Sequence, residues 1–149
     1  MRKVFIYVGL VLVAVGAAAG HATATSVRVV TVMLAPTATG DPDASGVAVL
    51  RIDVDGQEVC YDIVVRDIDQ PVEPSPGIGS AHIHGPGGGI AVDLETQFRT
   101  TGTDTYIATG CASASADTIE AILTNPEQYY VNVHTASFPA GAIQGSLGG

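Results

Sequence analysis

Residues 47–68 read VAVLRIDVDGQEVCYDIVVRDI and decide the fold class. Two runs rich in β-branched residues flank Asp55-Gly56, a dipeptide that favours a two-residue hairpin turn of the primed type. This turn fixes the register of the strands, and the register sets Asp53 against Glu58 on a face that must be in water. On the other face the predicted pairs are all apolar: Ile52 with Val59, Leu50 with Tyr61, and Ala48 with Ile63.

The rest of the chain continues as short strands separated by turn signals. Residues 27–34 predict an opening strand, and residues 129–135 predict a final hairpin with residues 142–147. The proline-rich segment 69–79 cannot pair inside a sheet. This spacing predicts an all-β Greek-key sandwich of about seven or eight strands with one short helix.

The short helix has a start signal and a stop signal. Residues 117–120 (DTIE) resemble a capping box, in which Asp117 caps the helix and Glu120 reaches back to it. The helix continues through Leu123 and ends at Asn125-Pro126.

Residues 1–24 have the pattern of a signal peptide. A positively charged start precedes an apolar run over residues 4–19 and a small-residue cleavage site at 22–24. Residues 17–19 (AAA) form a second possible cleavage site. An uncleaved anchor is the other alternative, but sixteen apolar residues are fewer than the ~20 needed to span a bilayer. We therefore expect a secreted mature chain that begins at Thr25, with one domain over residues 25–149 and no membrane anchor.

The chain is acidic, with six Lys and Arg residues against fifteen Asp and Glu residues. Removal of residues 1–24 would leave four arginines and a net charge of −11. This balance argues against partners such as nucleic acids or anionic membrane surfaces. The remaining length is typical of a single domain with one core.

Two cysteines in a secreted chain most simply form one disulfide, Cys60–Cys111. Free thiols and metal ligands are the alternatives. Free thiols would be oxidised outside the cell, and the pair lacks the Cys-x-x-Cys spacing of a metal site, so we expect the disulfide.

Two short segments hold three of the four histidines. His82 and His84 are two residues apart in a predicted strand, so their side chains point to one face, about 6.6 Å apart at Cα. His134 shares a strand face with Asn132, opposite the apolar Val131, and this parity predicts that His134 and Asn132 face outward or into a groove and that His82 and His84 face outward. Three neutral imidazoles with an open position suit Cu(II) or a catalytic-type Zn(II) site. The alternative is three separate, hydrogen-bonded histidines.

Three segments closely resemble the CHRD family, the domain named for chordin: residues 81–86 (AHIHGP), 125–135 (NPEQYYVNVHT) and 138–145 (FPAGAIQG). The similarity runs from about Val27 to Leu147, and residues 57–61 match the family's first-cysteine strand. The resemblance implies a secreted module to which no general activity is assigned. The family usually has Arg where this chain has Gln144, so an ionic role at that position does not carry over.

A weaker likeness is to copper/zinc superoxide dismutases, which are β-sandwiches with a His-x-His strand and an intramolecular disulfide. Carried over by this likeness, His82, His84 and His134 fall on copper-ligand positions. The zinc-site histidines have no counterpart, since His21 lies in the predicted signal segment, and the arginine that guides superoxide is also missing.

Three function classes follow. The first is a secreted CHRD sandwich that binds copper through His82, His84 and His134 for storage, delivery or redox chemistry. Copper ranks above zinc at equal geometry by the Irving–Williams order. The second is a metal-free interaction or matrix module with an unknown extracellular partner. The third, ranked lowest, is a superoxide dismutase-like enzyme, and we assign no catalytic residue.

Overall fold

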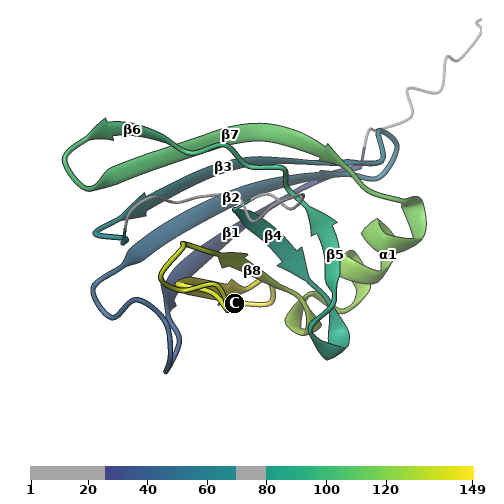
Figure 1. The fold of residues 1–149 in the computed structure, drawn as a ribbon. Coiled ribbons are helices and arrows are strands. Elements are labelled where there is room, and N and C mark those ends of the chain that lie inside the picture. The colour runs from purple at the N-terminus through teal and green to yellow at the C-terminus, as the bar shows by residue number, and fades with distance from the viewer. Residues whose placement is uncertain (1–25, 70–79) are drawn as a thin grey trace, which may run out of the picture.

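A computed structural model describes residues 26–69 and 80–149 (Figure 1). The predicted signal peptide, its cleavage site and residues 70–79 of the proline-rich segment lie outside these ranges. No helix in the described ranges has the length and hydropathy of a membrane span. The strands are β1 (Val27–Pro36), β2 (Ser45–Asp53), β3 (Glu58–Arg66), β4 (Ala81–His84), β5 (Ile90–Asp93), β6 (Arg99–Gly102), β7 (Thr105–Ser113), β8 (Tyr130–Val133) and β9 (Ile143–Ser146). The helical elements are α1 (Ala116–Thr124) and the 3-10 turns η1 (Pro86–Gly88) and η2 (Pro126–Gln128).

The nine strands form one antiparallel sheet in the order β5-β4-β8-β9-β1-β2-β3-β7-β6. The sheet curls into two layers that share β1, the purple strand of Figure 1. Residues 27–34 of β1 pair with β2 in the first layer, whereas Ala35 and Pro36 pair with β9 in the second. The predicted all-β class with one short helix is confirmed. The strand not predicted is β6, a fully exposed edge whose sequence, RTTG, has no apolar alternation.

The β2–β3 hairpin has the predicted register, with Ile52 opposite Val59, Leu50 opposite Tyr61 and Ala48 opposite Ile63. Its turn differs from the prediction. The strands end at Asp53 and Glu58, and the positive φ of 52° lies at Gln57 instead of Asp55 and Gly56. The loop is therefore a four-residue type, closed by a 2.9 Å hydrogen bond from the Gly56 N–H to Asp53 Oδ1.

One apolar core lies between the two layers. Every second residue of β2 and β3 is buried in it, as the alternation of a sheet with one wet face requires. The second layer contributes Ile83 from β4 and both Val131 and Val133 from β8, each fully buried. Side chains alternate along a strand, so the residues next to these three in β4 and β8 face away from the core.

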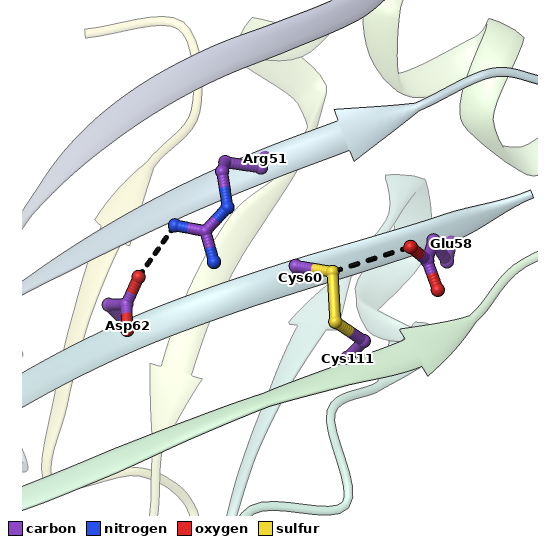
Figure 2. Close-up of polar contacts among 5 residues, drawn as sticks. All are labelled: Arg51, Glu58, Cys60, Asp62 and Cys111. Carbon is purple, nitrogen blue, oxygen red and sulfur yellow. Dashed lines mark hydrogen bonds and ion pairs between the residues drawn. A yellow bond between two sulfur atoms is a disulfide. The ribbon is translucent and has the colours of Figure 1, made fainter. Parts of the chain in front are cut away.

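The wet face of the first layer carries the predicted disulfide (Figure 2). Cys60 of β3 and Cys111 of β7 are cross-strand partners and are bonded to each other. Beside them, Arg51 on β2 makes a 2.6 Å ion pair with Asp62 on β3. Both cysteines of the chain are thus joined in one disulfide, and their alternative role as metal ligands is excluded.

Helix α1 begins two residues earlier than predicted. Its N-cap is Ser115, whose side chain accepts a hydrogen bond from the Thr118 N–H at 3.2 Å, so the assignment of Asp117 as the cap is wrong. Asp117 lies in the first turn, where a carboxylate complements the helix dipole. Ile119 and Ile122 anchor the helix to the core.

Candidate metal centre

The pairing of β4 with β8 brings the three histidines to one face. His82 lies opposite Asn132 and His84 lies opposite Tyr130. The His134 N–H donates to the Ser80 carbonyl at 2.8 Å, which extends the ladder by one more pair. Because directly opposite residues of an antiparallel pair share a face, all three imidazoles lie on the side of the second layer that faces away from the core.

A buried polar pair fixes the start of β4. Ser80 is fully buried, and its hydroxyl lies 3.3 Å from both the carbonyl and the hydroxyl oxygen of Thr96. The Ala81 N–H donates to that Thr96 hydroxyl at 2.8 Å. These bonds hold the backbone immediately before His82. Neither Ser80 nor Thr96 has a signal in the sequence that predicts this role.

The three rings gather around His82. Its ring centroid lies 4.5 Å from that of His84 and 4.5 Å from that of His134, whereas the outer two centroids are 6.4 Å apart. Nε2 of His82 and Nε2 of His134 are 2.9 Å apart. One nitrogen from each ring can be chosen so that all three lie within 4.8 Å of one another. The structure therefore brings together the three residues that the sequence singled out.

Two backbone carbonyls determine which nitrogen faces the cluster. Nδ1 of His84 is 2.8 Å from the Gly88 oxygen, and Nδ1 of His134 is 2.9 Å from the Pro139 oxygen. Since a carbonyl oxygen only accepts, each Nδ1 carries a hydrogen, and in the neutral ring Nε2 keeps its lone pair. Metal-bound histidines are oriented in the same way by a second hydrogen bond. Backbone acceptors leave no side-chain signal, so a sequence cannot reveal them.

The short Nε2–Nε2 contact has a defined chemistry without an ion. The hydrogen of neutral His134 is at Nδ1, so the donor in this contact is Nε2 of His82. An ion bonded to both nitrogens at about 2.0 Å, with an angle near 90°, would hold them about 2.8 Å apart. Exchange of this hydrogen for an ion would thus require little movement of the two rings.

The side chains of the histidines point away from the core as predicted, but His82 and Asn132 are buried there. His82 is 5% exposed and Asn132 is 3% exposed. The rings of His84 and His134 flank His82, and the loop of residues 135–141 covers Asn132, whose amide nitrogen lies 3.5 Å from the Ala140 oxygen. The loop follows the strand in sequence, and strand parity alone does not show that it folds back.

The cluster favours neutral imidazole at His134. Burial, the largest cause, lowers the pKa of His134 below its usual 6.5, and the neighbouring His84 lowers it further. The hydrogen bond to the Pro139 carbonyl acts in the opposite direction and raises the pKa. A neutral ring is the form that binds metals.

Aromatic packing supports the exposed side of the cluster. The ring of Tyr130 stacks on His84, with centroids 4.8 Å apart and an interplanar angle of 18°. The β4–β8 register that brings them together pairs residues far apart in sequence, so Tyr130 was not singled out from the sequence.

Comparison with protein-family models matches the CHRD domain over residues 21–147. The matched range includes all three clustered histidines and both cysteines. No curated protein matches the chain, and no solved structure matches it.

Proposed function

Because the chain belongs to the CHRD family, we propose that it is an extracellular module that binds one copper ion through His82, His84 and His134. The observation that carries the proposal is the convergence of the three imidazoles, which hold ligand atoms within 4.8 Å of one another. The ion would be stored or delivered, or would undergo redox chemistry at the site.

The cluster has the features that a metal site requires. The 2.9 Å between Nε2 of His82 and Nε2 of His134 is already close to the spacing of neighbouring ligands on one ion. Ligands bonded at about 2.0 Å lie no more than about 4 Å apart. A rotation of the His84 ring toward His82 would bring its ligand nitrogen within this distance; the ring now contacts the Gly88 carbonyl, the Tyr130 ring and the edge of His82.

The donor set favours copper over zinc. Three neutral imidazoles with an open position suit both metals, and at equal geometry the Irving–Williams order places Cu(II) above Zn(II).

An extracellular location agrees with the disulfide. Cys60–Cys111 is formed in the structure, and structural disulfides persist in oxidising compartments. We propose secretion by way of the signal-like segment 1–24, with cleavage before Thr25. Intact mass of secreted protein tests this directly, because retention of residue 1 would contradict it.

Metal analysis of untagged protein tests the copper proposal. We expect one Cu(II) per chain, bound more tightly than Zn(II), with nitrogen ligation in the electron paramagnetic resonance spectrum. His84→Ala should abolish tight binding and leave the fold intact, because this side chain is half-buried on the polar face and does not belong to the core.

Gln144→Ala is the matched control for this variant. Gln144 lies opposite Asn132 on β9, on the same face as the histidines, and is exposed. We expect this variant to bind copper like the unchanged protein. If the unchanged protein binds Cu(II) no better than His84→Ala does, the metal-free interaction module is the correct function class.

A further inference from the structure

Exposed hydrophobic side chains gather on β1, along the part of this strand that pairs with a neighbour on one side only. The described residues include four exposed large hydrophobic side chains, and three of them lie on one face of β1: Val27 at 47%, Val29 at 61% and Met33 at 70%. On one side, residues 27–34 pair with β2. On the other side, β9 pairs only with Ala35 and Pro36 and packs its Gly145 against the Met33 carbonyl. Within the described ranges, no strand pairs with this side of residues 27–32.

Apart from the charge of Arg28, this edge of β1 lacks the features with which proteins prevent strand addition. Residues 27–32 read VRVVTV, with no proline, no lysine and no bulge in their pairing with β2. Four of the six are valine and one is threonine, the residues that favour extended pairing. Within the part of the chain that the structure describes, the backbone groups on this side of residues 27–31 therefore have no strand partner and can pair with another strand.

We propose that this edge binds a second copy of the chain, with β1 pairing antiparallel to β1 across a two-fold axis. A two-fold axis perpendicular to the sheet keeps the same face of both copies on the same side, so it must pass midway between one residue and the same residue of the other copy. With the axis at Val29, Val27 lies opposite Thr31 of the other copy, and Arg28 lies opposite Val30. No like charges meet.

The charge of this edge allows two copies to approach each other here. The chain has a net charge of −9, so most of its surface repels another copy. Residues 27–32 contain no acidic side chain and one arginine. On the same face, the neighbouring strands carry the ion pair of Arg51 with Asp62 (Figure 2), and the exposed apolar side chains are concentrated on β1.

Sedimentation equilibrium of the metal-free protein tests the proposal independently of copper. We expect a monomer–dimer equilibrium that strengthens as salt screens the repulsion between the acidic copies. Val29→Lys places two like charges opposite each other at the axis, and we expect it to raise the dimer dissociation constant about tenfold or more. Thr31→Lys, also exposed on this edge, should act in the same direction.

Met33→Lys is the matched control. Met33 is on the same face and is more exposed than Val29, but β9 lies beside it. All three variants reduce the net negative charge by one, so a general charge effect would strengthen association in each. We expect the dissociation constant of Met33→Lys to stay within about twofold of the unchanged protein, since no strand of the other copy reaches it.

Hydrogen exchange provides a second readout, because amides of residues 27–32 should become protected as protein concentration rises. A protein that remains monomeric up to about 1 mM would overturn the proposal. Equal weakening of the dimer by all three lysine variants would also overturn it, because the two copies would then meet through the face of the sheet and not through its edge. Growth beyond the dimer would also overturn it, because a two-fold contact uses the edge of both copies.

Discussion

His82 occupies the centre of the candidate metal centre. It is the most buried of the three histidines, and the rings of the other two lie against it on either side. The outer two have their Nδ1 atoms bonded to backbone carbonyls, which leaves Nε2 to face the cluster. The site is therefore oriented by the backbone of two loops more than by other side chains.

The protonation of His134 predicts how the stability of the metal-free protein changes with pH. Burial lowers its pKa below 6.5, so the folded chain binds fewer protons at this residue than the unfolded chain does. The stabilisation is complete above pH 6.5 and is lost as pH falls through the lowered folded pKa. Urea unfolding between about pH 5 and pH 8 should show this decrease.

His134→Gln should have a flatter profile across the same range, because glutamine does not titrate. An equally steep profile in this variant would assign the pH dependence to other groups. Copper binding should weaken over the same interval, since protons compete for the ligand nitrogens.

At the scale of elements, the loop of residues 135–141 determines the orientation of His134. Pro139 supplies the carbonyl that binds Nδ1, and Gly141 lies against the amide of Asn132 with a φ of 122°. A Cβ at Gly141 would collide with that amide, and the positive φ disfavours any L side chain.

We expect Gly141→Ala to destabilise the protein by about 2–4 kcal/mol and to weaken copper binding, because the loop must shift and carry Pro139 with it. Gly87→Ala is the control, since Gly87 has a φ of 81° with nothing within 4 Å of a Cβ. It should cost only about 1 kcal/mol in chemical denaturation. Equal costs for the two variants would contradict the role given to the Asn132 contact.

The elements that the sequence predicts well are those with local, repeated signals. The β2–β3 register follows from alternating apolar residues on both sides of one turn, and it is correct even though the turn type is not. The side-chain face of His82 and His84 likewise follows from strand parity. The burial of His82, the Ser80–Thr96 anchor and the carbonyls of Gly88 and Pro139 depend on contacts between distant segments, for which this sequence has no local signal.

At the scale of the whole molecule, the disulfide and the histidine cluster lie on opposite outer faces of the two layers. Cys60 and Cys111 are on the wet face of the first layer, and the histidines are on the face of the second layer that points away from the core. The disulfide therefore contributes to stability, and the histidine cluster contributes separately to the proposed copper binding.

Replacement of both Cys60 and Cys111 by serine should lower the free energy of unfolding by about 4 kcal/mol, as loop-closure entropy predicts. The bond joins residues 51 positions apart, and the unfolded chain without it has more conformations. Denaturant titration measures this change. The copper content per folded chain should remain the same, and a loss of binding in this variant would show that the two faces are coupled.

The separation of His82 from His134 by 52 residues has a consequence for when a metal can be acquired. His134, the last of the three in sequence, lies in the C-terminal hairpin directly after β8, and β8 pairs with both β4 and β9 in the folded sheet. A nascent chain, or one crossing a membrane unfolded, therefore presents a pair of histidines and no third ligand. Under the proposed function, copper would therefore be acquired after export, from the ions available in the compartment where the chain folds.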